Sequence, residues 1–295
     1  MSGVNAPVVV GVDGSESALH AVRWAADEAR RRHLPLHLVH AHGIPVGYAP
    51  GFVDWHALHQ ALLAQARTWL DQARKVAEET VPGLAVQTVE VRAGAVPALL
   101  EESAHAGLLV LGTRGLGGFT GLLVGSTAIE VAAHARCPVV VVRGADLDGP
   151  VVVGVDGTPA GEPAIAFAFA EASTRRTNLV AVHAWTDLVL ETAFAGGAAA
   201  LDFAPLAQQA EEVLGERLAG WQEKYPDVTV SRHVSRERAS RALLGQAERA
   251  QLLVVGSRGR GGFRGLMLGS TSQHLLRHAP CPVAVTRTAP EAERP

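Results

Sequence analysis

Two glycine-rich segments carry the clearest chemical signal in this sequence. They read GTRGLGGFTGLLVGST at residues 112–127 and GSRGRGGFRGLMLGST at residues 256–271, and each follows an apolar run. Glycine inside a helix or strand costs stability, so its repeated use indicates backbone that takes positive φ angles or approaches another group closely. Both segments contain Gly-x-Arg-Gly, then nine residues, then Gly-Ser.

The last residues of each segment predict a helix start that can bind an anion. A capping box fits Thr127 with Glu130 in the first segment and Ser270 with Gln273 in the second. The amide groups and the partial positive charge of a helix N-terminus, together with turn amides, form an anion nest. Several such dipoles could hold a polyphosphate without a basic surface.

Other phosphate-binding loops fit this pattern poorly. A Walker loop ends in Gly-Lys-Ser or Gly-Lys-Thr, and neither segment contains lysine. A dinucleotide fingerprint follows the first strand and precedes an acidic residue by ~20 positions, whereas these segments follow the fourth predicted strand. A flexible glycine loop stays open as the simplest alternative, and the repetition argues against it.

The glycine segments belong to an internal repeat that decides the architecture. The other matching stretches are VVVGVDGS (8–15) with VVVGVDGT (151–158), LVHA (38–41) with AVHA (181–184), and PALLEES (97–103) with RALLGQA (241–247). The offset is 143 residues for the first two pairs and 144 afterwards, so one net inserted residue aligns the copies. We predict two domains, residues 1–146 and 147–295.

Strand and helix patterns alternate within each copy. In the first copy, apolar runs predict strands and apolar periodicity predicts helices, with Ser15 as an N-cap. The predicted strands cover 8–12, 36–41, 86–92, 108–112 and 138–143, and the predicted helices cover 16–32, 57–80, 97–105 and 127–135. This order predicts an α/β fold with helices on both faces of a parallel sheet. If strands one and four are neighbours, the loops after them form one site.

Composition limits the classes of partner. The 295 residues include 26 Lys and Arg against 29 Asp and Glu, and no basic stripe typical of a nucleic-acid binder. The longest apolar stretch, TAFAGGAAAL, is shorter than the ~20 residues of a membrane helix, and no charged-then-apolar leader opens the chain. The two cysteines, Cys137 and Cys281, are expected to be small buried hydrophobes. We expect a cytoplasmic protein with no nucleic-acid partner and no membrane insertion.

The sequence resembles the universal stress protein family over nearly its whole length. The resemblance rests on Gly112-x-x-Gly115 and Gly125-Ser126, nine residues apart, on the equally spaced Gly256-x-x-Gly259 and Gly269-Ser270, and on the aspartate of each GVDG, Asp13 or Asp156. The chain is similar to the tandem two-domain form found in actinobacteria. The resemblance implies two open parallel five-stranded sheets with strand order 3-2-1-4-5, an adenine nucleotide alpha hydrolase-like fold.

The resemblance also implies one ATP site per domain. In that family the glycine segment surrounds the phosphates and ribose, the first-strand aspartate lies near the nucleoside and metal, and the second strand ends at the adenine. The implied contacts in the first copy are Gly11, Asp13, Ala41, Gly112, Thr113, Arg114, Gly115, Leu116, Gly117, Gly118, Gly125, Ser126 and Thr127. Those in the second copy are Gly154, Asp156, Ala184, Gly256, Ser257, Arg258, Gly259, Arg260, Gly261, Gly262, Gly269, Ser270 and Thr271.

Simpler structural interpretations stay open for the charged residues. Asp13 and Asp156 are expected to contact the nucleotide or Mg²⁺, but they could instead cap a helix or stabilise the turn. Arg114 and Arg258 could pair with phosphate or be solvated. In either case we expect the serines that follow Gly125 and Gly269 to cap helices.

The remaining polar and loop features favour no second site. Among the histidines near the second strand, only His40 has a repeat partner, His183, so we expect hydrogen-bonded or exposed histidines rather than metal ligands. The connections at 43–56 and 187–205 differ between copies. They are expected to form mobile flaps over the nucleotide, with disorder as the alternative.

Together these features favour an ATP-binding stress-response regulator or sensor with slow hydrolysis at most. The sequence has no Walker carboxylate, His-Arg-Asp loop or Ser-His-Asp pattern to supply a general base. One alternative is an adenylating or α-phosphate-attacking enzyme, although GVDGSES lacks the double glycine of such loops. Another is a scaffold protein stabilised by bound nucleotide. The family resemblance also implies domain pairing through the fifth-strand edges and a homodimer, and the regulatory partner is unknown.

Overall fold

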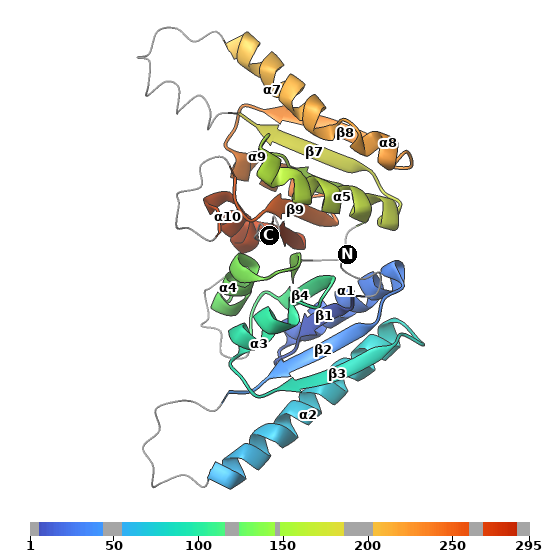
Figure 1. Ribbon diagram of the computed structural model, residues 1–295, viewed down its shortest axis with the longest axis vertical. Coiled ribbons are helices and arrows are strands. Elements are labelled where there is room, and N and C mark those ends of the chain that lie inside the picture. The colour runs from blue at the N-terminus through green and yellow to red at the C-terminus, as the bar shows by residue number, and fades with distance from the viewer. Residues whose placement is uncertain are drawn as a thin grey trace, which may run out of the picture. The chain divides into compact units, whose positions relative to one another are not determined.

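The protein consists of two α/β units, each built around a parallel sheet with helices packed against it (Figure 1). The computed structural model describes residues 6–43, 55–115, 124–144, 148–185, 203–259 and 268–287. Contacts divide the chain into residues 1–143 and 144–295. Each unit is treated below as a separate body.

The first unit has strand order β3-β2-β1-β4-β5, with every pair of neighbours parallel. Its elements are β1 (Val8–Gly11), α1 (Glu16–Arg32), β2 (Leu36–Ala41), α2 (Trp55–Thr80), β3 (Val86–Val91), α3 (Ala95–Glu102), β4 (Leu108–Gly112), α4 (Ser126–His134) and β5 (Val139–Val142). The predicted order 3-2-1-4-5 is confirmed. Helices α1 and α2 pack together, as do α3 and α4, so helices cover both faces of the sheet.

The second unit repeats this topology with strand order β8-β7-β6-β9-β10. Its elements are β6 (Val151–Gly154), the 3₁₀ turn η1 (Pro159–Gly161), α5 (Glu162–Arg175), β7 (Leu179–Ala184), α7 (Phe203–Leu218), α8 (Trp221–Lys224), β8 (Val230–Ser235), α9 (Ala239–Ala247), β9 (Leu252–Gly256), α10 (Ser270–His278) and β10 (Val283–Thr286). The η1 turn has no counterpart in the first unit, where α1 begins directly after its cap. Pro159, which lacks an amide hydrogen, occupies the first position of η1.

Burial explains why the central strands are apolar throughout. The side chains of Val8, Val9 and Val10 in β1 are almost completely buried, as are those of Leu108 and Leu109 in β4, because helices cover both faces of the sheet. The outer strands β3 and β8 are only half-buried or exposed and carry polar residues. The hydrophobic pattern therefore locates the centre of each sheet.

Helix α1 begins and ends as its sequence predicts. The predicted N-cap, Ser15, accepts a hydrogen bond from the amide of Ala18 at 3.1 Å. At the other end, His33 takes a left-handed conformation with φ 54°, and its amide donates to the carbonyls of Ala29 and Arg30. These caps fix where the loop after β1 stops and the helix starts, which positions the residues between them.

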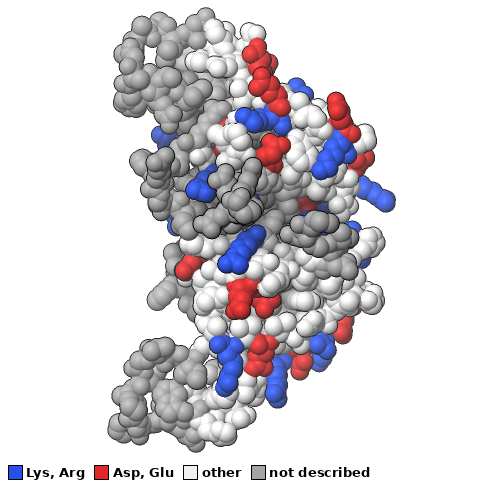
Figure 2. All heavy atoms as spheres, viewed as in Figure 1, with Lys and Arg blue, Asp and Glu red and all other residues white. Residues whose placement is uncertain are grey.

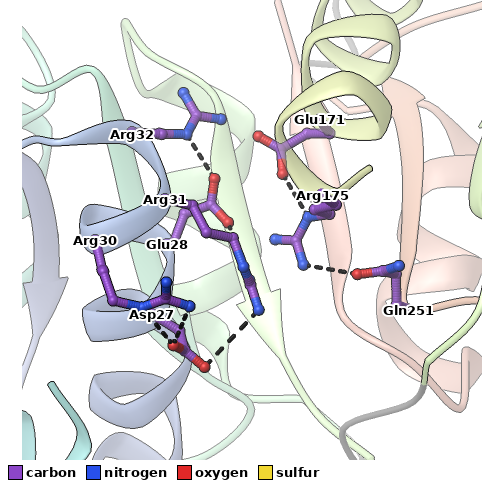
Figure 3. A network of polar contacts seen from close by, with 8 residues as sticks. All are labelled: Asp27, Glu28, Arg30, Arg31, Arg32, Glu171, Arg175 and Gln251. Carbon is purple, nitrogen blue, oxygen red and sulfur yellow. Dashed lines mark hydrogen bonds and ion pairs between the residues drawn. The ribbon is translucent and has the colours of Figure 1, made fainter. Parts of the chain in front are cut away.

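A glutamate is completely buried at the same place in each repeat, and an arginine one turn later neutralises it (Figure 3). In α1, Glu28 binds Arg32, and in α5, Glu171 binds Arg175 through Nε at 2.8 Å. The Nη1 of Arg175 also donates to Oε1 of Gln251 at 3.1 Å, which ties α5 to the residue before β9. Each pair thus compensates a buried charge within its own helix.

We predict that Arg175→Leu lowers the free energy of unfolding of the second unit by about 3–5 kcal/mol, because the buried Glu171 carboxylate loses this cation. The double variant Glu171→Leu/Arg175→Leu should recover most of that loss. Urea denaturation of the three proteins measures both effects. Equal losses in the single and double variants would show that the buried carboxylate is not the cause.

Both cysteines are buried, as expected from the sequence. Burial raises the pKa of the Cys137 thiol from 9.0 to about 12. Thiols react as thiolates, and at pH 8 a thiol with this pKa is ionised to roughly one part in ten thousand.

We therefore predict that Cys137 and Cys281 resist a thiol reagent at pH 8 in the native protein and that both react after denaturation. Absorbance of the released chromophore measures the reaction. Rapid labelling of Cys137 in the folded protein would contradict its burial.

The charges of the described residues form no single basic field on the face drawn in Figure 2, where Lys and Arg alternate with Asp and Glu. Within the described residues, no helix has the length and apolar character needed to cross a membrane.

Candidate functional site

The loops after β1 and β4 lie side by side because these two strands are parallel neighbours. Val8, Val9 and Val10 stand opposite Leu108, Leu109 and Val110. The second unit pairs β6 with β9 in the same way. Strand β1 lies between β2 and β4, so the chain order reverses here, which is where ligands bind open parallel sheets. The predicted adjacency of strands one and four is confirmed.

Asp13 connects the loop after β1 to the glycine segment. Its Oδ1 accepts hydrogen bonds from the Ser15 amide at 3.0 Å and from the Ser15 hydroxyl at 2.6 Å. Its Oδ2 faces Gly115, where a Cβ atom would lie only 2.3 Å away. Asp13 therefore stabilises the turn, and at the same time its second oxygen lies against the glycine segment.

Ser17, in the first turn of α1, contacts the start of the glycine segment. Its hydroxyl lies 3.2 Å from the Thr113 hydroxyl and accepts a bond from the Arg114 amide at 3.3 Å. Gly112 is required here, because a Cβ atom would lie 2.6 Å from the Ser17 carbonyl oxygen. The backbone of the segment therefore touches the helix start directly.

The second unit builds the same loop with different contacts. Oδ1 of Asp156 accepts from the Thr158 amide at 2.8 Å and from its hydroxyl at 2.9 Å. Ala160 replaces Ser17, so the hydroxyl contact to the glycine segment is missing on this side. Instead the Ser272 hydroxyl of α10 donates to the carbonyl of Gly256 at 2.6 Å. A serine fixes the segment in both units, but from opposite helices.

The expected serine and threonine caps at the ends of the segments are wrong. Helices α4 and α10 begin at Ser126 and Ser270, and their N-caps are Gly125 and Gly269, which provide no side-chain hydrogen bond. Neither capping box forms, and the Gln273 side chain donates instead to the Leu268 carbonyl at 3.1 Å.

The segment's own backbone causes this shift. The amide of Gly125 donates to the carbonyl of Thr113 at 2.7 Å, and Gly269 makes the same bond to Ser257. This closure places glycine at the cap, so no side chain caps the first amides of either helix. Thr127 and Thr271 lie in these first turns. The result favours anion binding more than a side-chain cap would.

Buried histidines fix the carbonyl that precedes each aspartate. His40 Nδ1 lies 2.7 Å from the carbonyl oxygen of Val12, and His183 Nδ1 lies 2.6 Å from that of Val155. A carbonyl can only accept, so Nδ1 carries the proton in both rings. The expectation of hydrogen-bonded histidines is confirmed for this pair. Their shared place in the repeat was the signal for a common structural role.

Ala41 and Ala184 end β2 and β7, next to these histidines, and Gly11 and Gly154 end β1 and β6. The register brings Gly11 opposite Val39 and Gly154 opposite Val182. The described strand-end residues of the predicted site thus gather at the carboxyl edge of each sheet.

Sequence reasoning missed Trp69, which packs over the loop after β1. Gly14 has φ +83°, and a Cβ atom there would lie 2.2 Å from Trp69 Nε1. The Trp69 ring also meets His40 edge-on, with centroids 5.2 Å apart. In the second unit, Gly157 has φ +78° and its carbonyl accepts from Arg217 Nε at 2.9 Å. Only the docking of α2 and α7 reveals these contacts.

Two arginines lie at the carboxyl ends of β9 and β10. Thr286 stands opposite Gly256, so Arg287 follows beside Arg258. Burial lowers the pKa of Arg287, and the charge of Arg258 lowers it further. Nη1 of Arg287 is buried and has no hydrogen-bond partner among the described residues. Arg114, the counterpart of Arg258, is exposed.

Part of the predicted site lies outside the described residues. This part comprises Leu116, Gly117, Gly118, Arg260, Gly261 and Gly262, together with most of the predicted flaps, residues 44–54 and 187–202. Among the residues that are described, no group of three or more His, Cys, Asp or Glu side chains could hold a metal ion by itself.

Residues 5–143 and 149–287 each match the model of the universal stress protein family. The chain is a universal stress protein. The universal stress protein Rv2623 of Mycobacterium tuberculosis is 42% identical over 295 residues, which cover 95% of this chain and 96% of the relative. A universal stress protein from Archaeoglobus fulgidus shares the fold, with a TM-score of 0.69 at 19% identity over 96% of this chain and 98% of that chain.

A shorter solved structure is also similar to part of this chain. It is the universal stress protein from Archaeoglobus fulgidus in complex with dAMP, 25% identical over 46% of this chain and 97% of that chain, with a TM-score of 0.35.

The close approach of Gly112 to Ser17 has no equivalent in the second unit, where the nearest contact to a Cβ at Gly256 would be 3.1 Å. We predict that Gly112→Ala lowers the free energy of unfolding by about 1–3 kcal/mol through overpacking, and that Gly256→Ala lowers it less. Thermal unfolding of the two variants measures the difference. Equal destabilisation would contradict the contact described for Gly112.

Proposed function

We propose that each domain of this universal stress protein, residues 1–146 and 147–295, binds one molecule of ATP and that the protein acts as a nucleotide-responsive regulator with little hydrolysis. The observation that carries the proposal is the convergence, in both units, of an aspartate loop and a glycine segment that leads into a glycine-capped helix. The family resemblance gives the ligand class.

The phosphates would lie between the glycine segment and the first turn of α4 or α10. The first amides of these helices have no side-chain cap, and they carry the positive end of the helix dipole. Arg258 and the partly buried Arg287 add two cations in the second unit, where an anion would relieve their mutual repulsion. Arg114 would play the corresponding role in the first unit.

Asp13 and Asp156 would hold Mg²⁺ or the nucleoside. In each, Oδ1 accepts hydrogen bonds within the turn, and Oδ2 lies nearest the glycine segment, at Gly115 in the first unit and Gly259 in the second. Oδ2 of Asp156 also accepts from the Thr158 hydroxyl at 2.9 Å. Mg²⁺ is usually shared between one or two carboxylates and phosphates, and it keeps several waters. One carboxylate beside a phosphate nest fits this arrangement.

The proposal includes regulation rather than turnover as the main role. The sequence lacks the patterns that supply a general base for phosphate transfer, and each buried histidine of the strand end already donates to a carbonyl. Pairing through fifth-strand edges, a homodimer, a cytoplasmic location and an unidentified protein partner complete the proposal. The absence of a positive charge excess in the sequence supports a partner other than nucleic acid.

The two aspartates allow a matched test of nucleotide binding. A Cβ at Gly115 would lie 2.3 Å from Oδ2 of Asp13, but a Cβ at Gly259 would lie at an ordinary 3.6 Å from Oδ2 of Asp156. We predict that Gly115→Ala displaces the Asp13 carboxylate and weakens Mg-ATP binding in the first domain at least about tenfold, which is about 1.4 kcal/mol. Gly259→Ala should weaken binding in the second domain less, because its Cβ atom would not displace Asp156.

Titration calorimetry of nucleotide-free protein measures this result, with two ATP per chain expected for the parent and for Gly259→Ala. The nucleotide released by denaturing the purified protein identifies the natural ligand. Absence of adenine-nucleotide binding would overturn the proposal, and turnover at ~1–10³ s⁻¹, the usual range of enzymes, would overturn the regulatory role.

A further inference from the structure

The first unit carries a histidine cluster between the start of α2 and the ends of β2 and β3. His42 lies directly after β2, and its Nε2 is hydrogen-bonded to Oε1 of Glu90 at 2.8 Å. Its ring lies 6.2 Å from that of His59 in α2 and 6.3 Å from that of His40. His42 is buried, with 7% of its surface exposed. Three imidazoles therefore lie in a row, from His40 in β2 through His42 to His59 in α2.

The bond between His59 and Arg92 fixes the protonation state of His59. Nη2 of Arg92 bonds to Nε2 of His59. A guanidinium can only donate, so Nε2 must accept and the single ring proton lies on Nδ1. That Nδ1 is buried and has no hydrogen-bond partner among the described residues. The observed contact thus requires a neutral His59.

The second unit has the same backbone at this place but different side chains. The amide of His42 donates to the carbonyl of Val91 at 3.0 Å, and the amide of Trp185 makes the equivalent bond to Ser235 at 3.2 Å. The strand registers and the repeat then align His59 with Phe203, Glu90 with Val234 and Arg92 with Arg236.

In that unit the arginine stacks instead of donating to a histidine. The guanidinium of Arg236 lies 3.6 Å from the centre of the Phe203 ring, and the Trp185 and Phe203 rings are 6.1 Å apart. Trp185, Phe203 and Val234 cannot take up a proton. The contacts of Phe203 with Trp185 and Arg236 at the start of α7 therefore do not depend on a histidine.

We propose that mild acid releases the N-terminal part of α2 but not of α7, which makes the first of the two nucleotide sites the pH-sensitive one. The effect on nucleotide rests on the proposed function; the effect on α2 does not. A histidine released into solvent can take up a proton between pH 7.5 and pH 5.5, so the two states are compared at these values.

Electrostatics gives the direction of the change. A protonated His59 loses the lone pair that accepts from Arg92, and its charge then lies beside that guanidinium. The described charged and titratable groups in contact with the cluster are His40 and His42 from β2 and its end, Glu90 and Arg92 from β3 and its end, and His59 from α2. Glu90 can neutralise one added proton, through His42, but a second adds repulsion.

Helix α2 transmits this change to the site. The same helix carries Trp69, which packs on Gly14 and meets the His40 ring. Gly14 directly follows Asp13, and His40 holds the carbonyl of the residue before Asp13. Release of α2 from its start as far as Trp69 therefore removes the cover of the aspartate loop in the first unit.

Amide hydrogen exchange of the full chain at pH 7.5 and pH 5.5, corrected for the intrinsic pH effect, tests the proposal. One linked proton should raise the opening constant of the segment 55–68 about tenfold between these values. The segment 203–214 of α7 is the control within the same molecule and should not change. Equal changes in both segments, or none in either, would overturn the proposal.

His59→Phe supplies a matched variant, because phenylalanine is the residue at the equivalent position of the second unit. It should remove the acid response of α2 while Arg92 stacks on the new ring as Arg236 does. A response that persists in this variant would show that His59 is not responsible. If the variant does not fold, the comparison of α2 with α7 in the parent protein still decides.

Titration with Mg-ATP at the two pH values completes the test. We expect two sites per chain at pH 7.5 and one site retaining its affinity at pH 5.5. Protonation of the phosphate itself affects both sites alike, so the second unit serves as its reference. Two unchanged sites at pH 5.5 would overturn the acid-sensitive site. No binding at pH 7.5 would overturn the proposed function, and amide hydrogen exchange would then test the release of α2 by itself.

Discussion

Parallel pairing of β1 with β4, and of β6 with β9, is the constraint on which both sites depend. It brings Ser15 within hydrogen-bond distance of the Arg114 carbonyl although 99 residues separate them in the chain. Parallel neighbours need a crossover connection, and among the described elements two further strands and at least three helices intervene between the paired strands of each unit. Without this pairing the aspartate loop and the glycine segment would be unrelated pieces of chain.

The glycine segments are restricted by their neighbours as well as by backbone conformation. A side chain at Gly112 would clash with the backbone of Ser17, and one at Gly115 would clash with the Asp13 carboxylate. The amide of Gly125 closes the segment by donating to the Thr113 carbonyl. A side chain at the first two positions would separate the elements that the strand pairing brings together. Tertiary contacts therefore require glycine at these positions. One consequence is that the helix after the segment starts without a side-chain cap.

The two units show how one backbone can be held by different side chains. The serine that fixes the glycine segment comes from α1 in the first unit and from α10 in the second. At the start of α2 Arg92 bonds to His59, whereas at the start of α7 Arg236 stacks on Phe203. The two units share the strand order and the closure of the glycine segment onto its own start, whereas the surrounding side-chain contacts differ.

The sequence by itself determined the elements and their order. The α/β fold was predicted from continuous apolar strands, helical periodicity, the Ser15 cap and the internal repeat. The family resemblance added the strand order. Together they predicted which of the described strand-end residues gather at the carboxyl edge of each sheet. The contact of those residues with nucleotide stays a prediction.

Only the tertiary structure decided which groups meet. The sequence placed the caps on serine and threonine, but closure of Gly125 and Gly269 onto the segment starts moved them to glycine. It also gave no sign that Trp69 covers Gly14 or that His59 faces Arg92. These contacts depend on how α2 docks on the sheet. Docking joins residues far apart in the chain, and no local pattern encodes which of them will touch.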